Sequence, residues 1–421
     1  MGRSVFAKAA WRLIPFMILL YVVSFLDRVN VGFAALTMNH DLGFTPEIYG
    51  FGAGIFFFGY FLFEVPSNVI MERVGARLWM CRIVLTWGIV SMATAFVRGP
   101  IEFYVVRFLL GLAEAGFFPG MVLYLTYWFP STMRARFIAL FLAGVPLASV
   151  VGGPVSGFIL GMENVSGLHG WQWLFLIEGA PACLLAFVIL FMLPDRPATA
   201  SWLSAEEKNE IETRLAAEPV RDHHALMPMF ADPRVWLLAI PDFGIVLALY
   251  GIGLWLPQIV KGMGFSNIET GFVVAIPYIA SMIGMVAWGY SSDLRNERPG
   301  HVAIAALLAA AGLIAAAMLG ESVGAIVALT VAAIGIYAAL SVFWTLPPSF
   351  LGGTAAAGGI ALINSISNLG GFFGPYLMGW LKQSTGGYAT GMLVLAGGLV
   401  LAAGLVMVIG GRALALASAP R

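Results

Sequence analysis

The chain has 421 residues, of which 60% are hydrophobic and only 10% are charged, and its formal net charge is zero. Its mean hydropathy is +0.91. This composition excludes a soluble globular domain, and the neutral balance gives no electrostatic case for binding nucleic acid. The two cysteines, Cys81 and Cys183, lie in or beside apolar runs and are interpreted as core residues. We therefore expect a multi-pass membrane protein without a disulfide, a metal or a cofactor.

The apolar runs are continuous over about 20 residues, the length that a helix needs to cross a bilayer. Strands of a membrane barrel would instead alternate with a period of two. The sequence therefore predicts an all-α integral membrane protein with twelve transmembrane helices. The predicted spans are 13–36, 48–70, 77–97, 101–128, 135–160, 171–193, 234–260, 268–290, 301–320, 322–346, 355–381 and 388–411.

The basic residues are distributed unevenly between the connecting segments. If the N-terminus is cytoplasmic, seventeen of the 22 lysines and arginines fall in cytoplasmic segments, and only Arg98, Lys261 and Lys382 fall in outer loops. Cytoplasmic loops of membrane proteins carry this excess of positive charge. An even number of spans then predicts that both termini are cytoplasmic.

A polar stretch divides the apolar runs into six and six. We predict an N-terminal bundle over 1–193, a cytoplasmic linker over 194–233 and a C-terminal bundle over 234–421. The charged run that follows Ser204 predicts a capped, solvent-facing helix within the linker. Similar segments recur in the two halves, because 138–140 leads to Gly153-Pro154 in the fifth span and 360–362 leads to Gly374-Pro375 in the eleventh. The two bundles are therefore predicted to be pseudo-symmetric.

Four charged residues lie inside predicted spans. Asp27 and Arg28 are in the first span, and Arg107 and Glu114 are two helical turns apart on one face of the fourth. A charge at the bilayer centre costs about 2.5–3.5 kcal/mol, so these residues need a reason to be there. One interpretation is a pair of structural salt bridges.

The other interpretation is a proton and anion site. Arg28 is the first candidate to bind a carboxylate through two parallel hydrogen bonds. Asp27, expected to face the fourth span, and Glu114 would exchange protons, with Arg107 as their movable counter-charge. Three further acids within spans lie beside proline or glycine and are interpreted as structural residues that bond backbone groups freed by helix breaks. They are Glu64, Glu178 and Asp242.

Several motifs carry a resemblance to a known family. Asp27-Arg28-Val29-Asn30, the loop over 72–77, and the segment from Arg107 to Gly120 resemble the major facilitator superfamily, in its anion:cation symporter branch. The segments 343–348 and 364–371 are similar to bacterial tartrate-type members. The loop departs from the usual pattern at Glu72, where the superfamily usually has Asp, and at Ala76, where it often has Arg.

The resemblance implies two six-helix bundles that work by alternating access, with a site between them. Tyr60 and Asn364 would line the substrate cavity; the alternative for both is a hydrogen bond in the core. Trp344 and Thr345 would form one wall of the pocket; the alternative is a role in packing. The residues implied fall into three groups: proton coupling by Asp27 and Glu114; substrate binding by Arg28, Tyr60, Arg107, Trp344, Thr345 and Asn364; and gating by Glu72, Arg73, Gly75, Arg77 and Asp293.

The function expected is proton-coupled import of a small hydroxycarboxylate, such as tartrate or a related sugar acid, across a bacterial inner membrane. Its partners would be the organic anion, protons and the lipid bilayer, and the protein would act as a monomer. The alternative is a proton-coupled antiporter that exports drugs or metabolites, although paired arginines in the cavity do not suit cationic drugs. An enzyme is not expected, because the five histidines fall in loops or at span ends.

Overall fold

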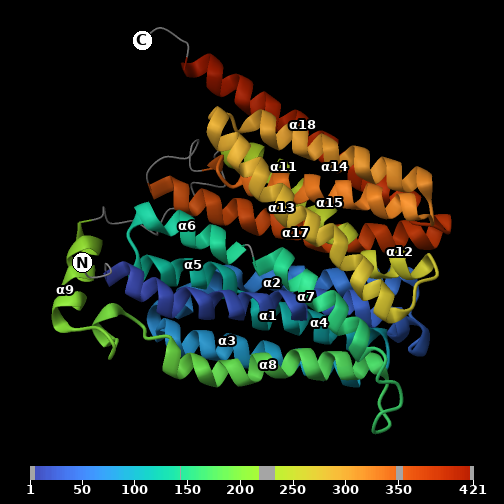
Figure 1. Ribbon diagram of the computed structural model, residues 1–421, viewed down its shortest axis with the longest axis horizontal. Helices are drawn as coiled ribbons and strands as arrows, with labels where there is room; N and C mark the ends of the chain where they lie inside the picture. The colour runs from blue at the N-terminus through green and yellow to red at the C-terminus, as the bar shows by residue number, and fades with distance from the viewer. Residues whose placement is uncertain (1–4, 143, 218–232, 348–353, 418–421) are drawn as a thin grey trace.

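The computed structural model describes residues 5–142, 144–217, 233–347 and 354–417, which are almost entirely helical (Figure 1). Within these ranges, ten segments are long and apolar enough to cross a membrane. The other two predicted spans, the fifth and the eleventh, fall on α6 with α7 and on α17. The first half contains α1 (Val5–Asp41), α2 (Pro46–Val74), α3 (Ala76–Ala93), α4 (Pro100–Glu114), α5 (Phe117–Trp128), α6 (Ser131–Leu142), α7 (Gly144–Ile159) and α8 (Gly170–Met192). The second half contains α11 (Pro233–Gly253), α12 (Leu256–Gly262), α13 (Asn267–Arg295), α14 (Pro299–Leu319), α15 (Val323–Phe343), α17 (Thr354–Thr385) and α18 (Ala389–Ala417).

Three of the predicted spans are each built from two helices rather than one. The fourth divides into α4 and α5, the fifth into α6 and α7, and the seventh into α11 and α12. At the first of these breaks, Gly116 adopts a left-handed conformation with φ 85°. An α-helix cannot continue through such a residue, so the chain turns there and leaves Glu114 as the last residue of α4.

The two halves repeat one packing pattern. In the first half α1 packs on α7 and α8, α3 on α4 and α8, and α2 on α4. In the second half α11 packs on α17 and α18, α14 on α15 and α18, and α13 on α15. Each of these six helices in the first half thus has a counterpart among the six in the second. The contacts between the halves obey the same correspondence, because α2 packs on α17 and α7 packs on α13.

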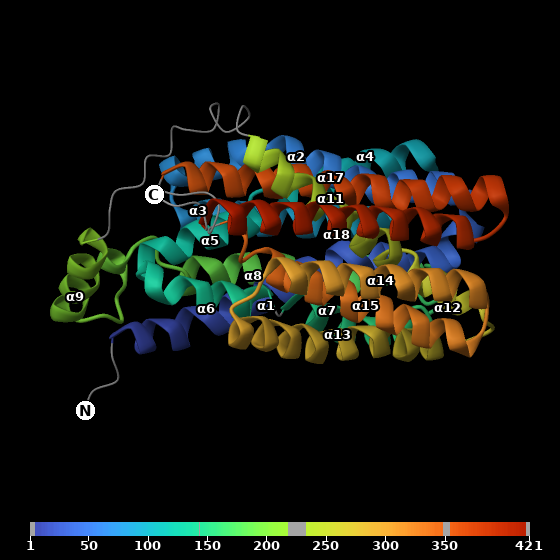
Figure 2. The ribbon, with the colours of Figure 1, turned by 90° about the horizontal axis from the view of Figure 1, so that it is seen from above.

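Both chain ends lie at the same end of the molecule, which we call the terminal end, and α12 lies at the opposite or far end (Figures 1 and 2). The linker helix α9 (Ala205–Ala216) is also at the terminal end. As predicted, Ser204 caps it, its hydroxyl accepting a hydrogen bond from the Glu207 amide. Lys8 forms an ion pair with Glu207 at 2.7 Å and so joins α9 to α1. Residues 218–232 of the predicted linker lie outside the described ranges.

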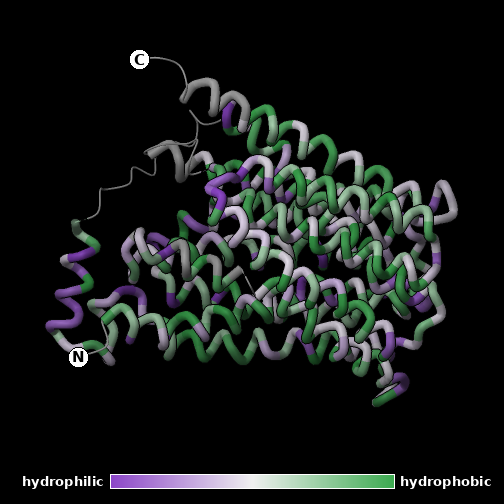
Figure 3. The backbone as a smooth tube through the Cα atoms, turned by 45° about the horizontal axis from the view of Figure 1, so that its top comes forward, coloured by the Kyte–Doolittle hydropathy of each residue, from purple (hydrophilic) through white to green (hydrophobic). Residues whose placement is uncertain are grey.

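Hydrophilic residues concentrate in α9 and at the helix ends, whereas apolar residues follow the helices along their lengths (Figure 3). The halves meet closely at the far end through glycines. A Cβ atom on Gly50 of α2 would stand 2.5 Å from the Pro375 carbonyl oxygen of α17. One on Gly153 of α7 would stand 2.6 Å from the Gly271 oxygen of α13. These glycines therefore let the backbones of the two halves approach one another.

Candidate functional site

The site is organised around Arg28, a buried residue in the middle of α1. Its guanidinium forms an ion pair with Glu114 and donates a hydrogen bond to the Tyr250 hydroxyl at 3.1 Å. Tyr250 belongs to α11, so Arg28 links α1 and α4 of the first half to the second half. A buried arginine with both partners in place is a fixed positive charge at the boundary between the halves.

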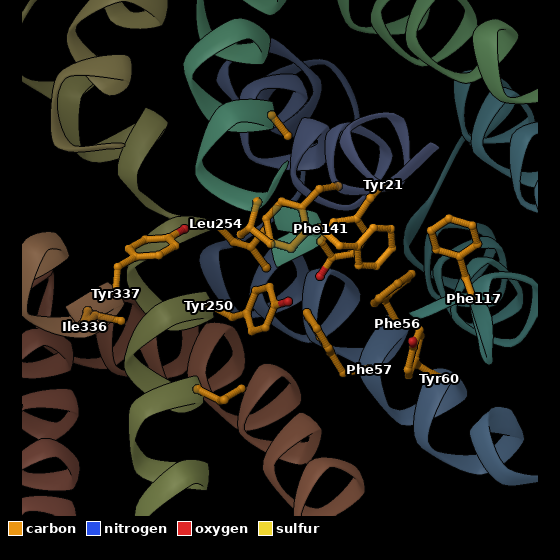
Figure 4. Packing of buried hydrophobic residues seen from close by; sticks show 14 of the residues in the cluster. Tyr21, Phe56, Phe57, Tyr60, Phe117, Phe141, Tyr250, Leu254, Ile336 and Tyr337 are labelled. Atoms are coloured by element: carbon orange, nitrogen blue, oxygen red, sulfur yellow. The ribbon is translucent and has the colours of Figure 1, made fainter. Parts of the chain in front are cut away.

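Aromatic rings surround this guanidinium. Its central carbon lies 5.4 Å from the ring centre of Phe25 and 5.3 Å from those of Phe56 and Tyr60. Such distances allow a cation to interact with ring faces. Figure 4 shows Phe57 beside Tyr250 and Phe56 beside Tyr60, where the halves meet. Tyr60, predicted to contact substrate, therefore lies beside Arg28.

Glu114 accepts two of the contacts that fix this centre. Besides its ion pair with Arg28, its Oε1 atom accepts a hydrogen bond from Ser24 at 2.7 Å. Its Oε2 atom has no hydrogen-bond partner among the described residues. Arg107, predicted as the counter-charge of Glu114, is not its partner here. The ion pair joins the first and fourth spans, because the rotation of α1 turns Arg28 toward the end of α4.

Asp27 faces α3 rather than the predicted fourth span. Its carboxylate accepts hydrogen bonds from Ser91 at 2.6 Å and from the Trp87 indole at 3.0 Å. Adjacent helical residues point about 100° apart, so Arg28 and Asp27 serve different neighbours. Asp27 is fully buried, and its hydrogen bonds come from neutral donors.

Arg107 is also fully buried and lies near the same centre. Its guanidinium approaches the Ala53 carbonyl oxygen at 3.5 Å and the ring centre of Phe56 at 5.2 Å. Its Nε and Nη1 atoms have no hydrogen-bond partner within the described part of the chain. Phe56 stands between the two arginines, contacting both. Arg107 therefore has unused donors beside the Arg28–Glu114 pair.

Asn364 of α17 reaches across the interface to Glu64 of α2. Its amide donates to Glu64 Oε1 at 2.7 Å, and the Ser365 hydroxyl donates to Oε2 at 3.0 Å. In this conformation Asn364 makes a core hydrogen bond, the alternative given above to lining the cavity. The backbone role predicted for Glu64 is wrong, because its carboxylate joins side chains of the two halves. The Glu-Val-Pro sequence carried no sign of partners 300 residues away.

The backbone role predicted for Glu178 is also wrong. Its carboxylate accepts a hydrogen bond from the Ser156 hydroxyl of α7 at 2.7 Å. Asp242 is fully buried in α11 and lies beside the Ser367 hydroxyl of α17. All three buried acids thus face side chains on neighbouring helices. No group of three histidine, cysteine or acidic side chains able to hold a metal ion occurs among the described residues.

Trp344 and Thr345 follow the last residue of α15, toward the terminal end. Trp344 packs edge-on against Phe343, and the Thr345 hydroxyl donates to the Val342 carbonyl oxygen at 2.7 Å. Thr345 is exposed. Both make these contacts within their own segment, and their place in the pocket wall stays a prediction.

Within the described part of the chain, the predicted gating residues make no side-chain hydrogen bond or ion pair with the other half. Glu72, Arg73 and Arg77 are exposed at the terminal end. In the second half, Asp293 forms an ion pair with Arg298 of its own loop at 2.6 Å. Their gating role stays a prediction.

Gly75 separates α2 from α3, with φ 98°. The Asp195 carboxylate approaches it, accepting a hydrogen bond from the Arg77 amide at 2.8 Å. A Cβ atom on Gly75 would lie 2.8 Å from an Asp195 oxygen, so glycine suits both the backbone and the space. Sequence reasoning missed Asp195, for which the only signal was an acid directly after the end of the sixth span.

Most of the chain matches the sequence profile of one known family. The sequence profile of the Major Facilitator Superfamily matches residues 17–375. The chain belongs to this superfamily. The resemblance based on the motifs is therefore confirmed, and the protein is a multi-pass membrane transporter.

Curated relatives of the superfamily cover nearly the whole chain. A "Putative tartrate transporter" of Agrobacterium vitis is 52% identical over 93% of this chain and 88% of its own length. A "Quinolone resistance transporter" of Acinetobacter baumannii is 44% identical, over 94% of this chain and 92% of its own. "Inner membrane transport protein RhmT" of Escherichia coli K12 is 41% identical, over 93% and 92%.

Solved structures of superfamily members share the fold. A bacterial homologue of the human lysosomal transporter Spinster, in an inward-facing and occupied conformation, superposes with a TM-score of 0.77 at 19% identity, over 97% of both chains. The Escherichia coli xylose transporter XylE, in a partially occluded inward-open conformation, gives 0.74 at 15% identity, over 93% of this chain and 96% of its own. The predicted fold class is confirmed.

Proposed function

We propose that this transporter couples the entry of a small organic anion to the entry of protons, in a bacterial inner membrane with both termini cytoplasmic. The anion proposed is a hydroxycarboxylate such as tartrate or a related sugar acid. The observation that carries the proposal is the buried Arg28, paired with Glu114 and bonded to Tyr250 of the other half. An arginine in this position offers two parallel N–H donors to a carboxylate.

The coupling follows from competition for one guanidinium. When a substrate carboxylate binds Arg28, Glu114 loses its cationic partner in a water-poor site. An unpaired buried carboxylate is costly, so Glu114 takes up a proton as the anion binds. The anion and the proton then move together. Release of the anion lets Glu114 lose its proton and pair with Arg28 again.

Asp27 is the second proposed proton carrier, since neutral donors surround it and Arg28 follows it directly in the chain. Arg107 has donors without partners and is proposed to bind the far carboxylate of a dicarboxylate. Tyr60 and Asn364 would supply hydrogen bonds to substrate hydroxyls. In this account Asn364 exchanges its bond to Glu64 for one to substrate.

Alternating access would proceed by parting the far-end contacts and closing the terminal end. The glycine contacts of α2 with α17 and of α7 with α13 hold the far end shut here. We propose that the predicted gating residues Glu72, Arg73, Gly75, Arg77 and Asp293, at or near helix ends, contact the other half when the terminal end closes.

The names of relatives support the substrate class and also an alternative. The relative described as a tartrate transporter favours a hydroxycarboxylate, and the relative described as a quinolone resistance transporter favours the alternative, an exporter of drugs. The arginine pair at the centre favours an anionic substrate in either direction. Import and export are distinguished by whether a pH gradient drives the substrate into the vesicles or out of them.

The decisive experiment uses purified protein in proteoliposomes with labelled tartrate and related hydroxycarboxylates. Glu114→Gln keeps the shape of the side chain but cannot exchange a proton. Uptake driven by an inward pH gradient should fall at least about tenfold, whereas exchange of labelled for unlabelled anion should survive with a flattened pH dependence. Glu102→Gln, an exposed change on the same helix, is the matched control and should behave as wild type.

If Glu114→Gln keeps the wild-type ratio of gradient-driven uptake to exchange over pH values of about 5.5–8, Glu114 is not the coupling residue. An outward-directed antiport would show the opposite dependence, because protons entering would then drive anion out of preloaded vesicles. If no hydroxycarboxylate is carried in either direction by the wild type, the substrate class is wrong.

A further inference from the structure

A small cavity lies on the far-end side of Asp27 and is lined by residues of both halves. Asn30 of α1, Ser149 and Ser156 of α7, and Glu178 of α8 line it from the first half. Tyr278 of α13 lines it from the second half, with Gly253 and Pro257 near the break between α11 and α12. It has about the size of one water molecule.

The polar atoms around this cavity are incompletely bonded. Glu178 accepts a hydrogen bond from Ser156 through Oε1. Within the described ranges, Glu178 Oε2, Asn30 Oδ1 and Ser149 Oγ have no hydrogen-bond partner, although their residues are only 6%, 1% and 4% exposed. Buried polar atoms are normally satisfied, so three such atoms around one cavity indicate that it holds a polar occupant.

Asn30 connects this cavity to the proposed coupling site. It lies one helical turn after Asp27 and donates to Asp27 Oδ1 at 3.5 Å. Its amide also lies beside the Glu178 carboxyl. Asn30 thus stands between two buried carboxyls, one on α1 and the other on α8.

The groups that face Glu178 define what it can bind. Asp27 on α1 is its acidic neighbour, and Tyr278 of α13 lines the same cavity. α7 contributes the Ser156 hydroxyl, and α3 contributes Trp87 and Ser91, which bond Asp27 instead. Cys183 lies further along α8 itself, near Asp27. Among the described lining residues there is no lysine or arginine. A carboxyl without a cationic side chain suits a proton or another monovalent cation.

The wall on the other side of the cavity belongs to the moving interface. Gly153 also lines the cavity, and it is the residue that meets Gly271 of the second half. When the halves part at the far end, Tyr278 and Gly253 must withdraw from Asn30 and Glu178. The cavity then opens to the far side, while Asp27 remains covered by α3.

From this arrangement we infer that Glu178 is a proton-entry residue that relays protons from the far side to Asp27. The inference rests on the proposed function. With the far end open, a hydronium ion in the outside water gives a proton to the Glu178 carboxylate: one O–H bond of the hydronium breaks, an O–H bond forms on Glu178, and neutral water is left. After closure, that O–H bond breaks, the proton crosses one water molecule held by Asn30 and Ser149, and an O–H bond forms on Asp27. Glu178 returns to the carboxylate, and no electrons are transferred.

The first measurement detects this proton directly, without transport. Infrared difference spectra of the reconstituted full-length protein, recorded as pH is changed, report the C=O stretch of protonated carboxyls. A titrating band should be lost in Glu178→Gln, persist in Asp27→Asn, and shift in Asn30→Ala. If Glu178→Gln does not fold, Ser156→Ala serves instead: it removes a hydrogen bond to the Glu178 carboxyl and should shift the same band. Glu163→Gln, in the loop between α7 and α8, is the control and should leave the band in place.

The second measurement is transport in the same proteoliposomes. Glu178→Gln should reduce gradient-driven uptake at least about tenfold while exchange stays within about twofold, because exchange needs no net proton entry. Equal losses in both would indicate a structural role and overturn the relay. A band that is absent from wild type, or that changes when choline replaces Na⁺, would overturn the proton assignment and, in the second case, point to Na⁺. If wild type accumulates no anion under a pH gradient, the proposed function fails, while the infrared band still decides whether Glu178 carries a proton.

Discussion

Replacing Gly50 by alanine should open the far end of the transporter. Its Cβ atom would stand 2.5 Å from the Pro375 carbonyl oxygen and 3.2 Å from the Gly379 Cα atom. Both belong to the backbone of α17, which cannot turn aside as a flexible side chain could. α2 and α17 must therefore move apart by several tenths of an ångström.

The size of the effect follows from the cost of overpacking. Inserting a methyl group into a well-packed contact costs about 1–3 kcal/mol. This cost falls on the conformation with the far end closed and is relieved when it opens. Since about 1.4 kcal/mol is a factor of ten, the ratio of open to closed protein should rise roughly 5- to 150-fold.

The assay labels a single cysteine at Thr270, which is fully buried next to the contact of α7 with α13. Cys81 and Cys183 are first replaced by alanine, and an impermeant maleimide is then added from the far side. The labelling rate should rise by the factor above in Gly50→Ala. Gly404→Ala on α18 is the control, because a Cβ atom there would meet nothing within 4 Å. A folded Gly50→Ala protein that labels no faster than this control would refute the idea that the glycine contact holds the far end closed.

Two further predictions concern the anion site and the topology. Arg28→Lys should weaken anion binding at least about tenfold, because an ammonium cannot make two parallel hydrogen bonds to a carboxylate. Binding is measured by the thermal shift that substrate causes. The control, Arg214→Lys on the exposed face of α9, should bind the anion as wild type does. Unchanged affinity in the lysine variant would exclude Arg28 from the site. A cysteine at the exposed Ala198 should react with an impermeant thiol reagent only from the cytoplasmic side, and labelling in intact cells would reverse the proposed orientation.

The order of the helices could be predicted because membrane spans are long apolar runs, and each predicted run falls on helix in the structure. Whether a span is one continuous helix or two could not be predicted from hydropathy alone, because the residues at a helix break are as apolar as those around it. At the break after α4 there was a signal, Gly116 followed by Pro119, but such residues also occur inside continuous membrane helices. Pro15 in α1 and Pro66 in α2 are examples.

The four buried charged residues of the candidate site could be picked out from the sequence, but not their pairing. A charged residue in an apolar run stands out, which is why Asp27, Arg28, Arg107 and Glu114 were found. Which side chains meet depends on the rotation of α1 against α3 and α4, and side-chain packing over the whole interface sets that rotation. Spacing within the fourth span favoured Arg107 as the partner of Glu114, whereas tertiary packing pairs Glu114 with Arg28.

The break between α4 and α5 has a mechanical consequence. Gly116 cannot be exchanged for a larger residue, because its Cβ position lies 2.1 Å from the Ser67 hydroxyl oxygen of α2. A span bends most easily where its helix is interrupted, and this interruption directly follows Glu114, the residue that pairs with Arg28. If this span bends during transport, we expect it to bend between α4 and α5, directly after Glu114. The Arg28–Glu114 ion pair would then oppose the bend, and losing the pair would ease it.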